Sequence, residues 1–252
     1  MKRLTRRGAG IAALIALLAA SAALTALYFH RTRALYTEVQ RVRLDPLGLD
    51  IYDGRRAIPP TAGPRVVLYG DSRVQQWVPP RIAGATIVNR GVGGQTTAQA
   101  LGRLDYDVLP LKPDVVVIQV GINDLKTVPL FPERAHEIIA RCQSQIREMA
   151  QTVERSGAQV VLTTVLPVAK PSFGKEHKSG QIQAAVESVN TFILSQRREG
   201  FEVLDVAAMV ADERGNVASG FSKDELHLSP DGYAAINPAL VRALRGPVQD
   251  PP

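Results

Sequence analysis

The sequence is poor in cysteine, and its first 33 residues contain no acidic residue. The single cysteine, Cys142, excludes an internal disulfide and any Cys-x-x-Cys metal or redox motif. Cys142 lies in a predicted helix beside Ile138, Ile139 and Ile146, where a small thiol is expected to be buried and unreactive. We therefore assign it no functional role.

The basic residues are concentrated at the N-terminus. A net charge of +6 and a pI near 9.7 would ordinarily indicate nucleic-acid binding. Residues 1–33 hold six of the 30 basic residues and none of the 24 acidic ones, so the remainder of the chain is formally neutral. The sequence thus predicts no nucleic-acid partner, and no protein partner can be inferred from it.

A long uncharged stretch follows the basic N-terminus. Residues 8–29 contain no charged side chain and are rich in Ala and Leu. A helix of this length spans a hydrocarbon core of roughly 30 Å, so residues 1–33 are predicted to be a membrane anchor or signal segment. Ala20-Ser21-Ala22 resembles a signal cleavage site, but the apolar run continues to Phe29, which favours an uncleaved anchor.

The charge around this segment predicts its orientation. Basic residues ahead of the apolar run hold the N-terminus in the cytoplasm. We expect an inner-membrane protein whose main domain lies outside the cytoplasm. A secreted or periplasmic protein after signal cleavage is the alternative.

The remainder divides into a linker, a domain and a short tail. Residues 34–64 begin with a helix-capable stalk and then become rich in Pro and Gly, which is typical of a linker that lies against a domain or holds it off a membrane. Residues 65–246 are predicted to form one domain, and residues 247–252 a C-terminal tail.

Within this domain, short apolar runs alternate with longer amphipathic segments. The apolar runs are residues 66–69, 86–88, 115–120, 159–165 and 202–204. The helical candidates are residues 97–104, 132–156, 180–198 and 230–245. Buried strands separated by amphipathic helices indicate a parallel sheet covered on both faces, which is a three-layer α/β/α domain. Ligands in such domains bind beyond the carboxyl ends of the strands.

The first apolar run ends in Gly70-Asp71-Ser72. A serine at a strand end places its hydroxyl at the rim of the sheet, although Asp and Ser are also common helix N-caps. The G-x-S-x-G motif of another hydrolase fold is absent, because Val74 occupies the last glycine position.

The next two runs end in segments that could donate hydrogen bonds to a ligand. Residues 89–97 include Gly91, Gly93 and Gly94, which permit an amide to point at a ligand oxygen or cradle a phosphate, but the segment lacks G-x-G-x-x-G and the P-loop lysine. Asn123 follows the third run, and its amide could face a developing oxyanion or simply form a turn.

Asp224 and His227 lie three residues apart, just before a predicted helix. This spacing allows the carboxylate to orient the imidazole and stabilise its cation. A metal-ligand pair or a solvated loop is the alternative, but no second histidine lies near enough in sequence to suggest a metal site. Only this one of the four histidines has such a context.

The four segments together resemble the SGNH hydrolases, also called the GDSL-like lipase/acylhydrolase family, over roughly residues 65–245. The resemblance implies a three-layer sandwich with a mainly parallel, flavodoxin-like, five-stranded sheet. It implies Ser72 as nucleophile, His227 as base and Asp224 as its carboxylate partner. It further implies an oxyanion hole made by the Ser72 and Gly94 amides and the Asn123 side chain, with no metal or cofactor.

This resemblance implies a serine esterase that forms an acyl-enzyme. Arg73 stands where many members have Leu, and Gln95 where Asp is common, so the substrate cannot be transferred from the family. Lipid esters and O-acetylated cell-wall sugars both remain open. The alternatives are an O-acyltransferase with the same residues and a catalytically silent, membrane-tethered module that binds glycan or lipid.

Three aromatic residues and one loop are candidates for substrate recognition. Trp77, Phe131 and Phe173 could line an acyl or sugar site, although core packing is the simpler interpretation of each. Residues 167–180 could overhang the strand ends, or form an ordinary solvated loop.

Overall fold

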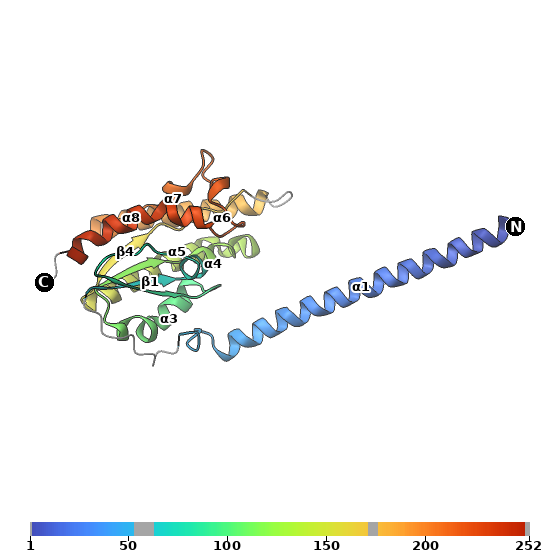
Figure 1. The fold of residues 1–252 in the computed structure, drawn as a ribbon, viewed down its shortest axis with the longest axis horizontal. Coiled ribbons are helices and arrows are strands. Elements are labelled where there is room, and N and C mark those ends of the chain that lie inside the picture. The colour runs from blue at the N-terminus through green and yellow to red at the C-terminus, as the bar shows by residue number, and fades with distance from the viewer. Residues whose placement is uncertain (1, 53–62, 171–175, 250–252) are drawn as a thin grey trace. The chain divides into compact units, whose positions relative to one another are not determined.

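The computed structural model describes residues 2–52, 63–170 and 176–249, which form two compact units, Met1–Pro46 and Leu47–Pro252 (Figure 1). The first unit is the helix α1, Lys2–Leu44. Within the described residues, α1 is the one helix long and apolar enough to cross a membrane. It includes both the predicted membrane segment and the helical part of the predicted stalk, and it suggests a signal or anchor.

The second unit contains a five-stranded parallel sheet in the order β2-β1-β3-β4-β5. The strands are β1 (Arg65–Gly70), β2 (Thr86–Gly91), β3 (Val115–Gln119), β4 (Gln159–Thr163) and β5 (Glu202–Leu204). All five coincide with predicted apolar runs. Every residue of β3 is buried, as expected of a central strand covered on both faces.

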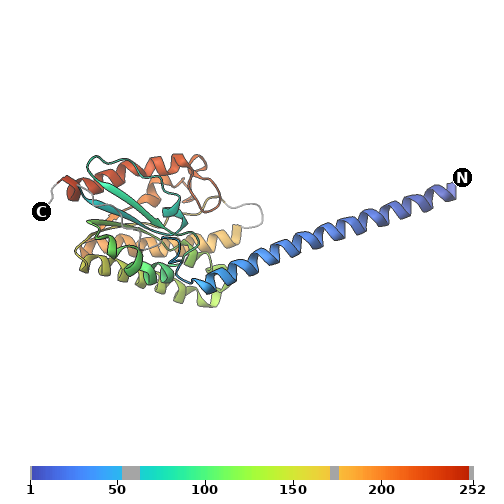
Figure 2. The same ribbon diagram turned by 60° about the horizontal axis from the view of Figure 1, so that its bottom comes forward.

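Helices cover both faces of this sheet (Figure 2). The helices of this unit are α2 (Ser72–Gln75), α3 (Thr97–Asp107), α4 (Ile122–Leu125), α5 (Ala135–Arg155), α6 (Glu176–Ser195), α7 (Val206–Val210) and α8 (Pro230–Gln249). Short 3-10 turns span Leu109–Leu111, Val128–Leu130, Pro132–Arg134, Gln196–Glu199 and Ser219–Phe221. The predicted three-layer α/β/α fold is confirmed.

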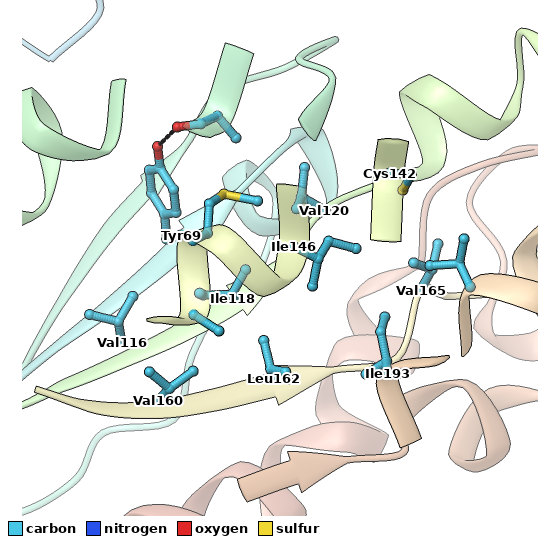
Figure 3. Packing of buried hydrophobic residues seen from close by; sticks show 14 of the residues in the cluster. Tyr69, Val116, Ile118, Val120, Cys142, Ile146, Val160, Leu162, Val165 and Ile193 are labelled. Carbon is cyan, nitrogen blue, oxygen red and sulfur yellow. Dashed lines mark hydrogen bonds between the residues drawn. The ribbon is translucent and has the colours of Figure 1, made fainter. Parts of the chain in front are cut away.

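The alternation of side chains along the strands produces two hydrophobic cores. On one face, Tyr69, Ile118 and Leu162 pack against α5 and α6, and the Tyr69 hydroxyl donates to the Ala100 carbonyl of α3 (Figure 3). On the other face, alternate strand residues pack against α7 and α8. Each fully buried large aliphatic side chain contributes about 1.5–3 kcal/mol.

The helix α6 begins earlier than the sequence indicates. We expected a helix from Gly180 and a loop over residues 167–180, but α6 starts at Glu176. Gly180 is accommodated inside the helix, where a glycine costs about 1 kcal/mol relative to alanine. Val168 and Ala169, at the start of the predicted loop, are buried and pair with Val217, so this part is not a free overhang.

Candidate active site

Ser72 is the first residue of α2, directly beyond the carboxyl end of β1. Asp71 is the N-cap of this short helix, and its Oδ1 accepts a hydrogen bond from the Arg73 amide at 2.9 Å. The capping interpretation is therefore correct for Asp71. The Asp71 carboxyl group is fully buried, and this burial raises its pKa against the opposing attraction of Arg73.

The Ser72 hydroxyl lies at hydrogen-bond distance from a histidine that comes from the other end of the domain. Ser72 Oγ is 2.9 Å from His227 Nε2. His227 Nδ1 is 2.9 Å from both carboxylate oxygens of Asp224. The structure thus brings three residues proposed for catalysis from the sequence into one continuous hydrogen-bonded line.

Asp224 is held by the turn that it begins. Its Oδ1 accepts from the backbone amides of Leu226 at 2.8 Å and His227 at 2.9 Å, in addition to the imidazole. Partial burial opposes ionisation, but the hydrogen bonds from Leu226 and His227 outweigh it and lower the pKa of Asp224. The folded structure therefore favours the ionised form of the Asp224 carboxylate, which faces the His227 imidazole.

The glycine-rich loop passes beside the serine. A Cβ added at Gly93 would lie 3.8 Å from Ser72 Cβ, so this backbone runs close to the hydroxyl. Gly94 has φ +78°, a conformation that residues with a side chain rarely adopt. The loop therefore brings Gly93, the residue before Gly94, close to Ser72, and the Gly94 amide as an oxyanion donor stays a prediction.

Asn123, just beyond β3, is buried with its amide orientation fixed by two partners. Nδ2 donates to the Gln95 carbonyl at 2.9 Å, and Oδ1 accepts from Lys126 Nζ at 2.6 Å. An ammonium can only donate, so the partner of Lys126 must be the amide oxygen. Since an amide NH₂ has two hydrogens, Asn123 keeps a second donor beyond the one given to Gln95.

Arg73 is a further element of the site, and its guanidinium is buried. It donates to the carbonyl oxygens of Leu226 (2.9 Å), Leu166 (2.7 Å) and Pro167 (3.3 Å). Burial lowers the pKa of Arg73 to about 10, opposed chiefly by Asp71. Arg73 thus connects the serine segment to the turn that carries His227 and to the chain beyond β4.

Neither a metal site nor a reactive thiol is evident in the described ranges. No group of three or more His, Cys, Asp or Glu residues that could hold a metal ion occurs in the part of the chain described. Cys142 is buried, and burial raises the pKa of its thiol, as expected for a packed core residue.

The aromatic candidates have different positions. Trp77 is buried, stacks on Tyr233 with ring centroids 6.1 Å apart, and donates from Nε1 to Asn237 Oδ1 at 2.9 Å, so it is a packed core residue. Phe131 is 45% exposed and lines a cavity of about 240 Å³ together with Asp124. Phe173 lies outside the described residues.

Two residues near the site were not found by sequence reasoning. Arg73 stands where many members of the family have Leu, and an arginine directly after the serine is a sequence signal of an altered environment. Lys126 lies three residues after Asn123, which is the spacing of neighbours on a helical turn, and this spacing could have identified it.

Comparisons with known proteins identify a related family and similar sequences. The sequence profile of the GDSL-like Lipase/Acylhydrolase family matches residues 60–235. The chain is 29% identical over 129 residues to YqeF, an uncharacterised lipoprotein of Bacillus subtilis (strain 168), covering 44% of this chain and 52% of that protein. It is also 29% identical over 84 residues to an acetylxylan esterase of Geobacillus stearothermophilus, covering 32% and 38% of the two chains. The chain thus spans about half or less of the length of these relatives.

A solved structure shares the fold. The GDSL-like lipase from Bacteroides thetaiotaomicron VPI-5482 superposes with a TM-score of 0.62 at 24% identity, covering 79% of this chain and 96% of that one. At this sequence identity the similarity shows that the two chains have the same fold and says nothing about the substrate.

Proposed function

The chain belongs to the GDSL-like lipase/acylhydrolase family, and we propose that it is a serine-dependent acyl-ester hydrolase with Ser72 as nucleophile and His227 as general base. The observation that carries this proposal is the hydrogen-bonded line from the Ser72 hydroxyl through His227 to Asp224. Serine hydrolases of unrelated folds use the same order of groups.

The reaction proceeds in two steps. His227 Nε2 takes the Ser72 proton as Oγ bonds to the ester carbonyl carbon, and the bond to the alcohol oxygen then breaks as the alcohol receives that proton. In the second step His227 takes a proton from water as the water oxygen bonds to the acyl carbon, and the bond from that carbon to Ser72 Oγ then breaks as Oγ regains the proton, which releases the carboxylic acid. Asp224 orients the ring and stabilises its cation in both steps.

The negative oxygen that forms in each step is stabilised by three donors. These are the Ser72 amide, the Gly94 amide and the free N–H of Asn123. One such donor contributes about 10²–10³ in kcat in enzymes where it has been removed. Lys126 increases the polarisation of the Asn123 amide, because it donates a charged hydrogen bond to Oδ1.

The proposed substrate is an ester on the extracytoplasmic side of the membrane. The basic residues ahead of the apolar helix favour export of the domain. An enzyme held there meets acylated lipids and O-acetylated cell-wall sugars. Similarity to an acetylxylan esterase supports the acetylated glycan, since that relative is named for removing acetyl groups from a sugar polymer.

The proposal is tested by the hydrolysis of a short-chain aryl ester by the purified full-length protein. Ser72→Ala is expected to abolish turnover, whereas Ser144→Ala, an exposed serine of α5, leaves it unchanged. Turnover by Ser72→Ala at the wild-type rate would refute the assignment. Esters of graded acyl length and acetylated glycans, compared by kcat/KM, then separate the two substrate classes.

A further inference from the structure

We propose that residues 47–52, which follow the apolar helix, form a brace that positions the oxyanion-hole loop, residues 91–95, for catalysis. This inference rests on the function proposed above. The brace begins three residues after α1 ends at Leu44, but it belongs to the same compact unit as the sheet. It is therefore part of the active-site support as well as a connection to the membrane segment.

One end of the brace is fixed to the last residue of the loop. Gln95 Nε2 donates to the Leu47 carbonyl oxygen at 2.6 Å. The Leu47 side chain lies on α3, where a Cβ added to Gly102 would be 2.8 Å from Leu47 Cδ2. A side chain at position 102 would therefore displace the end of the Leu47 side chain, so Leu47 packs directly against the backbone of the helix at Gly102.

The other end of the brace is fixed to the first residue of the loop. The Tyr52 hydroxyl donates to the Gly91 carbonyl oxygen at 2.7 Å. The Arg90 guanidinium carbon lies 4.7 Å from the centroid of the Tyr52 ring, which is cation-π distance. The two ends of the brace thus hold the two ends of the loop that contains Gly94.

Gln95 connects the brace to the oxyanion donors. The Gln95 side chain is buried, and its Oε1 accepts a hydrogen bond from Arg103 Nε. The main-chain carbonyl oxygen of Gln95 accepts a hydrogen bond from Asn123 Nδ2 at 2.9 Å. Arg103 also donates to the Gly70 carbonyl at 2.8 Å, two residues before Ser72. A displacement of Gln95 therefore reaches the Asn123 donor directly and the serine segment through Arg103.

The identity of residue 95 agrees with this role. An amide both donates and accepts, so Gln95 can join the Leu47 carbonyl to Arg103. An ionised Asp, which is common at this position in the family, has no hydrogen to donate to the carbonyl. The glutamine at position 95, where the family commonly has Asp, is thus the residue that the brace requires.

The brace acts on the transition state and not on substrate binding. Oxyanion donors are effective only where their geometry is already fixed, and a misplacement of about 1 Å can cost two orders of magnitude in rate. Loosening the loop is therefore expected to lower kcat and leave KM unchanged. Cleavage after Ala22 would leave the brace intact, so the inference applies to an anchored or a processed protein.

The test uses the full-length protein in detergent micelles. Tyr52→Phe removes only the hydroxyl that binds Gly91, and Leu47→Ala removes the contact with α3; Tyr106→Phe, an exposed tyrosine of α3, is the matched control. We expect a roughly 5–10-fold lower kcat for Tyr52→Phe and a larger loss in the double variant, with KM within about twofold. Labelling by a fluorophosphonate is expected to slow in parallel.

Two results would overturn the brace. One is a wild-type kcat in the double variant; the other is a lower Tm for Tyr52→Phe with unchanged kcat, which would assign these contacts to folding alone. Failure of the underlying function is distinct, because the wild-type protein itself would then resist labelling and hydrolyse no ester.

Discussion

Arg73 Nε donates to the carbonyl oxygen of Leu226 at 2.9 Å, so the residue after the proposed nucleophile holds the residue before the proposed base. The two are 153 positions apart in sequence. The same guanidinium donates to two carbonyl oxygens beyond β4. The separation of Ser72 and His227 is therefore fixed by a buried cation as well as by their own hydrogen bond.

Arg73→Leu restores the residue that many family members have, yet we expect it to destabilise this protein. Three carbonyl oxygens lose their donor and Asp71 loses its opposing charge, which together cost roughly 3 kcal/mol. Thermal unfolding should show a Tm lower by roughly 6–12 °C. Arg134→Leu, at a half-exposed surface arginine, is the control and should change little. A variant as stable as the wild type would contradict the proposal that Arg73 holds the serine segment to Leu226 and to the chain beyond β4.

Asn123→Ala removes the side-chain donor of the proposed oxyanion hole. We expect kcat to fall about 10²–10³-fold with KM changed less than about threefold, because the lost contact forms chiefly in the transition state. Steady-state kinetics on an aryl ester measure both constants. Asn216→Ala, in the turn after α7, should match the wild type. An increase in KM alone would show that Asn123 binds the ground state.

Lys126→Met keeps the length of the side chain and removes the ammonium that donates to Asn123 Oδ1. We expect kcat to fall about 3–10-fold, a modest loss because the lysine is exposed. Lys126→Arg should recover part of the lost kcat. A higher salt concentration should reduce the difference in kcat between Lys126→Met and the wild type. Lys112→Met is the matched control. An unchanged kcat in Lys126→Met would remove this lysine from the site.

The stability supplied by Asp224 should depend on pH in one direction. Despite partial burial, its hydrogen bonds lower the pKa of Asp224 below the ordinary value of 3.8, so the folded state favours the carboxylate. This stabilisation is present above that value and is lost as pH falls through the lowered pKa. The Tm difference between wild type and Asp224→Asn should be constant above about pH 5 and shrink below pH 4. A difference that grows in acid would contradict this sign.

Much of the fold follows from local patterns in the sequence. The run over residues 115–120 predicts a central strand because its four consecutive apolar, β-branched residues, 115–118, suit burial on both faces, and the structure buries every residue of β3. The pairing of Asp224 with His227 was also accessible, since both lie in one turn. The alternation of strands and helices predicts a parallel sheet, and therefore predicts that Ser72 and Asn123 lie at the same edge of it, beyond the carboxyl ends of the strands.

The long-range supports of the site were not accessible in this way. Arg73 and Gln95 both bind main-chain carbonyl oxygens, of Leu226 and Leu47 respectively. Every residue has such an oxygen, so these partners leave no signature in side-chain type or spacing. The contacts of Arg73 and of the brace can therefore be identified only from the folded structure.

The most direct test of the central claim is covalent labelling with a fluorophosphonate, followed by peptide mass spectrometry to locate the modified residue. The account predicts one adduct, on Ser72, formed rapidly by the wild-type protein and very slowly by His227→Ala. An adduct on another serine, or equal labelling rates in the wild type and His227→Ala, would contradict it.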